Sequence, residues 1–585
     1  MMDNNQKKLR LDKYHGALLG AVMGDALGWP NEQNSKKIGR STPPDKELFQ
    51  KWSRRCGGRF WAHEEEIGPG EYSDDTQLII ATARSLNYGS NWDNHFSRIE
   101  IPAWLSYERG GGGATKRAAE IWKKGEKPWK LEAKSLSYFN AGGNGVAMRI
   151  LPHIFRNEGN INEVMYQVLL NGIFTHGHPR ALLGATLYAD ALICLADHIG
   201  TLRYGELINL LIERKDIWSH FPKIGKLEEW FIDAETAMKG KFMDIWNTVV
   251  VEVIDLLNIA KEGLELGALD TGTYILEKIG CLDKRINGSG TVTAVASIYL
   301  SSKYASNPNI GLIEAAYLAN SDTDTLASMV GGLLGMLHGT EWFSNAWLNV
   351  QDYEFLKMLI QNNGHPEKNA LLTQIKLLDS TNPFFKSSLK DIKVGEKITA
   401  LPFNTLTVLE KKFNKTNMKG IHIHTIKLKS EEGQTIYIKT FEKSLEKTLI
   451  SPVERKTNKD INNGLVDFLF PQINKYPTDV NDIVSGKEHT KTHITERRPL
   501  SGTLPEKKQV IINVYKLRSL ANILPENMPA DQYLFLVSDI MREIERTQTG
   551  KLDEKTLSFL RERFKNFYIK NQHIEKIIKV LNQPV

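Results

Sequence analysis

The sequence predicts an all-α N-terminal part, then a small β domain and a second helical segment. Between Tyr14 and Gly339 apolar residues recur at helical spacing, and we find no convincing strand pair there. After Asn382 short runs rich in β-branched residues alternate with polar turns, which is typical of strands. Residues 508–581 return to helical spacing. At 585 residues the chain is too long for one core, so we expect several domains.

Four glycines mark one face of the first helix. Gly16, Gly20, Gly24 and Gly28 are spaced by four, so they form a single stripe. A glycine inside a helix costs about 0.5–1 kcal/mol relative to alanine, so the stripe indicates close approach of another helix or of a ligand. We favour close helix packing. Apolar periodicity predicts further helices at Thr76–Leu86, Ala181–Ala196, Phe242–Ala260, Val292–Leu300 and Leu326–Leu337.

In the predicted β domain, the third strand has a change of pattern. Its apolar residues switch parity between Ile423 and Ile426, which requires either a bulge near His424 or a strand buried on both faces. Both alternatives stay open. The expected strands are Ile392–Phe403, Leu406–Phe413, Gly420–Lys429 and Thr435–Phe441.

Composition favours a cytoplasmic protein. The formal charge of +6 is mildly basic and permits an anionic ligand without indicating one. Cys56, Cys194 and Cys281 show no CxxC spacing, so neither a disulfide framework nor a zinc site is expected. The N-terminus lacks the apolar core of a secretory signal. The apolar segment Gly16–Trp29 contains Asp25 and is shorter than the roughly 20 residues that a membrane span needs, so no membrane association is predicted.

Two acidic clusters, far apart in the chain, share one shape. Ser73-Asp74-Asp75-Thr76 and Ser321-Asp322-Thr323-Asp324-Thr325 each precede an apolar helix. A helix start needs one capping side chain and does not need two Asp residues, so capping alone does not account for both clusters. Two charges about 4 Å apart repel by roughly 4 kcal/mol at an effective dielectric of about 20. Converging carboxylates therefore indicate a hard cation such as Mg²⁺, Mn²⁺ or Ca²⁺.

Three other segments lie between the acidic clusters. The Gly-rich turn Gly142–Gly145 precedes a predicted helix, where exposed N–H groups suit a phosphate. Thr175-His176 lies before an apolar helix, where a ligand contact and an ordinary cap are equally compatible with the sequence. The loop Arg109–Gly113 must be flexible or sterically crowded, and a mobile loop at a site is one interpretation.

In this order, the segments resemble the ADP-ribosylglycohydrolase family, over roughly Tyr14 to Gly339. The motifs that carry the resemblance are Gly24-Asp25-Ala26-Leu27-Gly28 with Glu32, Tyr72-Ser73-Asp74-Asp75-Thr76, Gly143-Asn144-Gly145 with Met148-Arg149, Thr175-His176, and Asp322-Thr323-Asp324-Thr325. The resemblance implies an all-α orthogonal helical bundle. The resemblance and the changes of composition after Asn382 together predict a catalytic domain at 12–382, a small β domain at 383–452, a polar linker at 453–507 and a helical segment at 508–585.

The resemblance also implies a role for each matching residue. The metal ligands would be Ser73, Asp74, Asp75, Asp322, Asp324 and Thr325, holding two Mg²⁺ ions or, alternatively, Mn²⁺. Glu32 matches the acidic residue near the reacting water, whereas Asp25 is expected in helix packing or behind the ligands. Gly143, Asn144, Gly145, Met148 and His176 match positions that bind the distal ribose and diphosphate.

The implied activity is hydrolysis of the bond between C1 of the distal ribose and an ADP-ribosylated protein or other macromolecule, with free ADP-ribose as product. A metal-dependent nucleotide phosphohydrolase, or a non-catalytic ADP-ribose-binding or structural protein of the same fold, are the alternatives. Many family members that act on ADP-ribosylated arginine carry an Asp in the loop that corresponds to Arg109–Gly113. Here this loop, which follows Glu108, holds no carboxylate, so the resemblance does not imply arginine as the acceptor. The C-terminal part is compatible with recruitment of a modified protein, nucleic-acid contact or self-association.

Overall fold

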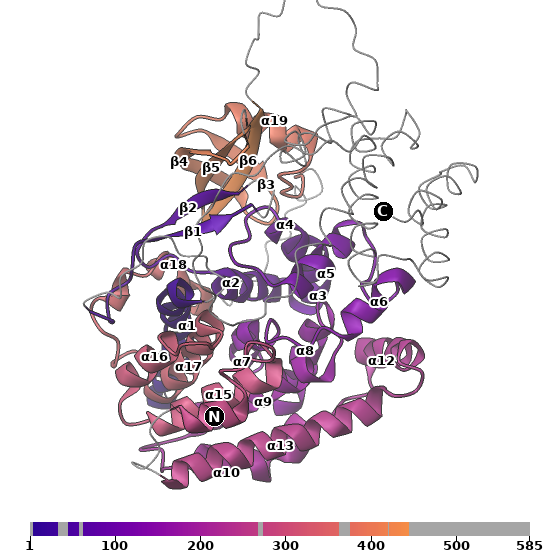
Figure 1. Cartoon of the computed structure of the whole chain (residues 1–585), viewed down its shortest axis with the longest axis vertical. Coiled ribbons are helices and arrows are strands. Elements are labelled where there is room, and N and C mark those ends of the chain that lie inside the picture. The colour runs from indigo at the N-terminus through magenta and orange to yellow at the C-terminus, as the bar shows by residue number, and fades with distance from the viewer. Residues whose placement is uncertain are drawn as a thin grey trace, which may run out of the picture. The chain divides into compact units, whose positions relative to one another are not determined.

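The computed structural model describes residues 4–32, 45–57, 62–266, 273–361, 375–418 and 421–443 (Figure 1). All of them belong to one compact unit, Met1–Glu446, and Lys447–Val585 is a second unit. The predicted linker at 453–507 and helical segment at 508–585 lie outside the described residues.

The described part is rich in helices, as predicted, and carries a small sheet after them. The helices predicted from periodicity correspond to α1, α2, α9, α13, α15 and α17, with ends that differ by a few residues. The strands are β1 Trp52–Cys56, β2 His63–Ile67, β3 Lys397–Ala400, β4 Asn404–Lys415, β5 Ile421–Ser430 and β6 Thr435–Lys443. The helices are α1 Asn4–Gly28, α2 Asp74–Leu86, α3 Trp92–His95, α4 Ile101–Trp104, α5 Gly113–Lys123, α6 Glu132–Phe139, α7 Leu151–Arg156, α8 Ile161–Ile173, α9 Pro179–Asp197, α10 Glu206–Glu213, α11 Lys215–Trp218, α12 Gly225–Ala237, α13 Phe242–Leu266, α14 Tyr274–Ile279, α15 Gly290–Lys303, α16 Pro308–Ala316, α17 Thr323–His338, α18 Tyr353–Gln361 and α19 Pro383–Asp391.

The prediction that the N-terminal part contains no strand pair was wrong. Strands β1 and β2 form an antiparallel hairpin in which Trp52 pairs with Ile67. In β2 the buried and exposed residues alternate as a strand requires, but the buried face includes the charged residue Glu65. Arg54 of β1 neutralises this carboxylate, with 2.9 Å between Nε and Oε2. An inward-facing ion pair therefore hid the alternation of apolar residues on which a strand prediction depends.

The C-terminal sheet is antiparallel, in the order β3-β4-β5-β6. Strand β5 pairs regularly with β6, and the irregularity lies in β4, between Val408 and Glu410. A bulge therefore exists in the neighbouring strand and not at His424. Buried residues of β5 lie on one face from Ile421 to Thr425 and on the other from Ile426 to Ser430, so each half of the strand buries one face and the second predicted alternative does not hold along its length. Helix α19 precedes the sheet, and β3 is shorter than the strand predicted there.

The sheet and the helices share one hydrophobic core. Buried sheet residues such as Leu406, Ile426 and Ile438 belong to the same contiguous core as the helices. The Phe403 ring lies 5.3 Å from that of Tyr107, in the segment after α4. In Figure 1 the sheet lies over the β1–β2 hairpin and near α4. Residues on both sides of the predicted boundary at 382 thus belong to the same compact unit.

Helices α1 and α17 cross at a contact lined by glycines, as the stripe in the first helix led us to expect. A Cβ atom at Gly20 would lie 2.3 Å from the carbonyl oxygen of Gly331, and one at Gly331 would lie 2.0 Å from that of Gly20. At Gly24 the corresponding distance to the Ala327 oxygen is 2.1 Å. Only hydrogen fits between the two backbones, so glycine is required for this approach.

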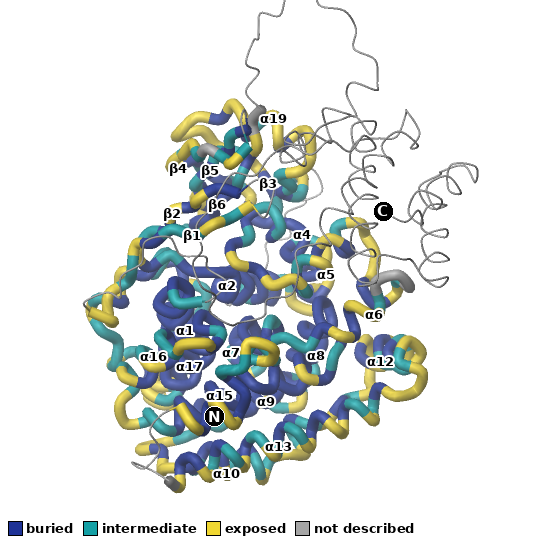
Figure 2. The backbone as a smooth tube through the Cα atoms, in the orientation of Figure 1, coloured by how far each residue is buried: buried dark blue, intermediate teal, exposed yellow. Residues whose placement is uncertain are grey.

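Burial is greatest in the central helices. In Figure 2 helices α1, α9 and α17 are mostly dark blue, whereas α10, α12 and α13 expose one face. Within the described residues, Pro179–Asp197 is long and apolar enough to cross a membrane, but 89% of the apolar window lies inside the protein. This is the composition of a core helix.

The glycine contact generates a stability prediction. Gly24→Ala should destabilise the protein by about 3 kcal/mol or more, because a methyl group 2.1 Å from a backbone oxygen forces the helices apart. Thermal unfolding measures this loss. Gly112→Ala is the control, since a Cβ there meets nothing within 4 Å, and its unfolding temperature should match that of the wild type. Equal unfolding temperatures for both variants would contradict the close contact.

Candidate metal and substrate site

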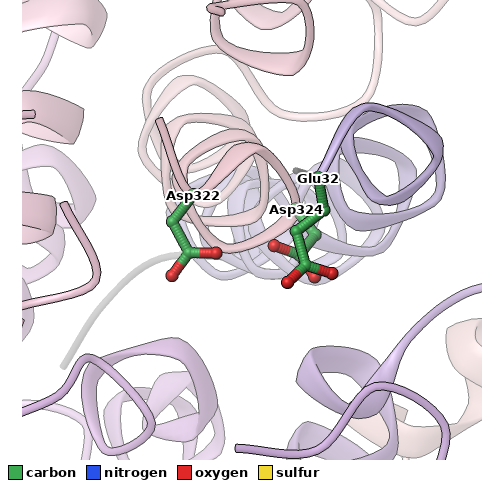
Figure 3. Close-up of side chains that lie close together, drawn as sticks. All are labelled: Glu32, Asp322 and Asp324. Atoms are coloured by element: carbon green, nitrogen blue, oxygen red, sulfur yellow. The ribbon is translucent and has the colours of Figure 1, made fainter. Parts of the chain in front are cut away.

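The contact between α1 and α17 brings three carboxylates together. Glu32 follows α1, whereas Asp322 and Asp324 lie at the start of α17, and carboxylate oxygens of the three lie within 4.8 Å of one another (Figure 3). Thr323 ties the start of α17 to the end of α1, because its hydroxyl donates to the Gly28 carbonyl at 2.9 Å. Residues about 290 positions apart in the chain thus form one acidic cluster.

The start of α2 is held beside this cluster by Asp25. The buried Asp25 carboxylate accepts hydrogen bonds from the Ser73 and Thr76 amides at 3.1 Å and from the Thr76 hydroxyl at 2.6 Å. Ser73 caps the helix, since its hydroxyl accepts from the Asp75 amide at 3.3 Å. Both oxygens of Asp25 therefore accept hydrogen bonds that position the start of α2, which is the packing role expected for this residue.

Asp75 joins the two acidic motifs. The Thr325 hydroxyl donates to Asp75 Oδ1 at 3.4 Å, which links α17 to α2. The other oxygen, Asp75 Oδ2, is buried and has no hydrogen-bond partner among the described residues. A buried carboxylate oxygen without a donor is costly, so this atom suits a cation as partner.

Electrostatics at the cluster point the same way. Burial raises the pKa of Asp74, Asp75 and Asp324 well above the usual range of aspartates. Neighbouring carboxylates raise it further, notably Glu108 for Asp74 and Glu32 for Asp324. The repulsion would be relieved by a divalent cation, and carboxylate and hydroxyl oxygens are the donors that Mg²⁺ and Mn²⁺ prefer. The donor set therefore fits the metals that the sequence predicted.

The predicted substrate loop touches the acidic cluster through Asn144. Its side-chain Nδ2 donates to Asp322 Oδ2 at 2.8 Å, and its backbone N–H donates to the Gly288 carbonyl at 2.9 Å. Gly143 forms a bridge with Ser289, so the loop is fixed against the segment before α15. Asn144 thus sets the position of a candidate metal ligand, a role that its sequence motif alone did not reveal.

His176 and Met148 support the loop from the protein interior. A Cβ at Gly145 would lie 3.0 Å from the His176 ring. Burial, with Arg149 nearby, lowers the pKa of His176 to about 3, so the ring is neutral at physiological pH. Met148 is buried, and its amide donates to the Asn144 carbonyl at 3.2 Å. Arg149 Nη1 donates to the Gly145 carbonyl at 2.6 Å, which fixes the end of the loop.

The glycine-rich loop after Arg109 is crowded at its first two glycines, whereas a Cβ at Gly112 would meet nothing within 4 Å. A Cβ at Gly111 would lie 2.4 Å from the Trp104 ring, and Gly110 has a φ of +102°. Glu108 accepts from the Gly111 amide at 3.0 Å and lies close enough to Asp74 to raise its pKa. Glu108 is a residue of the site that sequence motifs missed, because its relation to Asp74 depends on the fold.

Comparison with known proteins identifies the family of this chain. A family model described as ADP-ribosylglycohydrolase matches residues 6–371. Because the match covers more than half of the 585 residues, this chain belongs to the ADP-ribosylglycohydrolase family, a family of hydrolases. The resemblance inferred from the motifs is confirmed. Strands β3–β6 lie outside the matched residues.

Individual relatives are distant. ADP-ribosyl-[dinitrogen reductase] glycohydrolase of Rhodospirillum rubrum is 25% identical over 275 residues, which cover 46% of this chain and 87% of the relative. ADP-ribosylhydrolase ARH3 of Danio rerio is 23% identical over 358 residues, which cover 58% of this chain and 86% of the relative. A solved chain described as an ADP-ribosylglycohydrolase-related protein complex has 20% identity and a TM-score of 0.38, and covers 60% of this chain and 97% of that one.

The contacts of Asp25 generate a second prediction. Asp25→Asn should destabilise the protein by about 2–3 kcal/mol, because an amide NH₂ would face N–H and O–H donors that now bind a buried acceptor. Thermal unfolding measures the loss. Asp255→Asn is the control, since that side chain is exposed on α13, and its unfolding temperature should not change. An unchanged temperature for Asp25→Asn would contradict its role at α2.

Proposed function

We propose that this protein is a divalent-metal-dependent hydrolase that removes ADP-ribose from a modified protein or other macromolecule, cleaving the bond at C1 of the distal ribose. The observation that carries the proposal is the convergence of Glu32, Asp322 and Asp324 within 4.8 Å, in a chain of the ADP-ribosylglycohydrolase family. The Rhodospirillum relative is named for an ADP-ribosylated protein substrate, which supports a protein as the modified macromolecule.

Two Mg²⁺ or Mn²⁺ ions would be held by Ser73, Asp74, Asp75, Asp322, Asp324 and Thr325. Bound divalent ions supply charge stabilisation for ribose oxygens and favour ionisation of a water molecule. Within this donor set, Thr325 and Asp75 already share a hydrogen bond, and Asn144 holds Asp322. These contacts reduce the freedom that the donors would lose on binding a cation.

Glu32 is the candidate for proton transfer. It follows the short turn Trp29–Asn31 at the end of α1 and lies at the edge of the acidic cluster, half-buried. A carboxylate there can orient water toward C1 and accept its proton as the C1–acceptor bond breaks. The acceptor group leaves with a proton, and the products are ADP-ribose and the unmodified macromolecule. The loop at Gly143–Gly145 would hold the diphosphate and ribose nearby.

The metal assignment has a direct test. Asp324→Ala should weaken Mn²⁺ binding by at least about 100-fold and abolish ADP-ribose release, because loss of a direct ligand exceeds the 10–100-fold effect typical of residues behind the ligands. Calorimetric titration measures the affinity. Asp255→Ala, at an exposed position of α13, is the control and should bind like the wild type. Unchanged affinity in folded Asp324→Ala would reject the assignment.

The role of Glu32 has a separate test. Glu32→Gln should lower kcat about 10²–10⁴-fold while ADP-ribose binding is retained, because the group acts mainly in the transition state. Kinetics with a small ADP-ribosylated substrate and a binding titration with ADP-ribose separate the two effects. Glu66→Gln, on the exposed face of β2, should leave both unchanged. Near-normal kcat in Glu32→Gln would exclude an acid–base role.

Product analysis separates the proposal from its alternatives. Release of ADP-ribose with an intact diphosphate supports a glycohydrolase, whereas cleavage of the diphosphate supports a phosphohydrolase. A protein that binds ADP-ribose but releases none from modified substrates would be a binding protein of the same fold. The assay is best run with Mg²⁺ on arginine-, serine- and nucleic-acid-linked ADP-ribose, because the loop after Glu108 leaves the acceptor open.

A further inference from the structure

Strand β6 of the C-terminal sheet contacts residues of the N-terminal part that lie near the candidate metal ligands of α2. Its residues Thr435, Tyr437 and Lys439 alternate along the strand, and they bond to Asp352, Glu71 and Glu65 respectively. Between them, Ile436 and Ile438 point to the opposite face and are fully buried in the shared core. These residues lie beyond the match to the family model, which ends at 371.

The first set of contacts fixes Arg109. The Tyr437 hydroxyl donates to Glu71 Oε1 at 2.7 Å, and Arg109 Nη1 donates to the other oxygen of Glu71 at 2.7 Å. The Arg109 guanidinium also lies 3.9 Å from the centre of the Tyr437 ring. Lys439 Nζ donates to Glu65 at 2.7 Å, and Arg109 Nε bonds the same carboxylate at 3.2 Å. Arg109 is therefore held by two carboxylates, each of which β6 also binds.

Burial makes these contacts strict. Glu65 and Arg109 are each about 2% exposed or less. Burial alone would raise the pKa of Glu65, but the charges of Arg54, Arg109 and Lys439 together lower it well below its usual range, so the carboxylate is ionised. Buried charges need defined partners, and a shift of one partner is therefore transmitted to the others.

Arg109 lies directly before a glycine that packs on Asp74, a candidate metal ligand at the start of α2. It is followed by Gly110, where a Cβ would lie only 3.1 Å from Asp74 Oδ1 and 3.3 Å from the Trp29 indole nitrogen. A change in the position of Arg109 therefore moves the backbone that packs against a candidate metal ligand and against the turn before Glu32. The absence of space for a side chain leaves no room to absorb such a change.

The second set of contacts leads to the start of α2, the helix that carries Asp74. Thr435 donates to the Asp352 carboxylate through its amide and its hydroxyl, each at 2.6 Å. The buried Tyr72 hydroxyl donates to Asp352 at 2.9 Å, so this carboxylate connects β6 with the residue immediately before Ser73. Strand β6 thus reaches both the start of α2 and the loop that packs on it.

We propose that β6 positions the candidate cation ligands at the start of α2, Ser73 to Asp75, with Tyr437 and Lys439 as positioning residues that act through Glu71, Glu65 and Arg109. The inference rests on the proposed function of those ligands. The sheet would then be a working part of the cation site, although none of its residues touches a candidate ligand in the contacts described above. The relevant strand is contributed by residues outside the family match, so this support is a feature of this chain's own extension.

Two variants of β6 and one control test the proposal. Lys439→Met removes the charge and keeps the length, and Glu65 retains Arg54 and Arg109, so the fold should survive. Tyr437→Phe removes the hydroxyl but keeps the ring under Arg109. Lys411→Met is the matched control in the same sheet, because the Lys411 ammonium bonds only backbone carbonyls of residues 390 and 392 among the described contacts.

Three measurements on the full chain are needed, one of them independent of metal. Hydrogen exchange without metal should be several-fold faster at residues 72–77 and 108–112 in both β6 variants than in wild type and Lys411→Met. Mn²⁺ binding by calorimetry should be weaker by about 3–10-fold in both, as expected for residues that act through a contact network. In steady-state assays, raising Mg²⁺ should restore kcat, because a higher concentration fills a weakened cation site.

Each alternative outcome has a definite meaning. If the folded variants show the amide exchange rates and the Mn²⁺ affinity of the wild type, β6 does not position the candidate ligands at the start of α2, and the inference is overturned. Faster exchange with unchanged Mn²⁺ affinity also overturns it, because the sheet then acts on stability alone. If the wild type itself binds no Mn²⁺ and releases no ADP-ribose, the proposed function fails, and that result is distinct from an exchange difference in the variants.

Discussion

The backbone contact between α1 and α17 sets the geometry on which the acidic cluster depends. Glycines on both helices allow the carbonyl oxygens of one to approach the Cα atoms of the other, so the two helix axes cannot slide or separate without losing the contact. Glu32 leaves the end of one helix and Asp324 begins the other. The distance between the two helix ends is therefore set by backbone sterics. This steric contact keeps the carboxylates close together although they repel each other.

Much of this arrangement was predictable from the chain. The spacing of Gly16 to Gly28 predicted close packing, and the ordered motifs around Asp74 and Asp322 predicted the family and a meeting of the two acidic clusters. Helix α9 was predictable as a long apolar run, nearly all of it buried, and α13 because its buried residues recur at helical spacing. These features depend on local sequence, or on a motif whose members are each recognisable alone.

The remaining features depend on partners that no local pattern reveals. Strand β2 escaped prediction because its inward-facing Glu65 breaks the apolar alternation and is satisfied by Arg54, Arg109 and Lys439 from three other segments. The role of Asn144 toward Asp322 and the approach of Glu108 to Asp74 likewise arise only in three dimensions. Charged residues on a buried face are ambiguous in a sequence, since burial is acceptable only after the partner is known.

The glycine contact also bears on how the protein is made. Gly16 and Gly339 pack together at its far end although one lies near the start of the chain. At about 5–20 residues per second, a ribosome needs on the order of 15–60 s to synthesise the roughly 300 residues between them. During that interval the glycine face of α1 has no native partner. The acidic cluster therefore cannot assemble until α17 has been synthesised, however early α1 itself becomes helical.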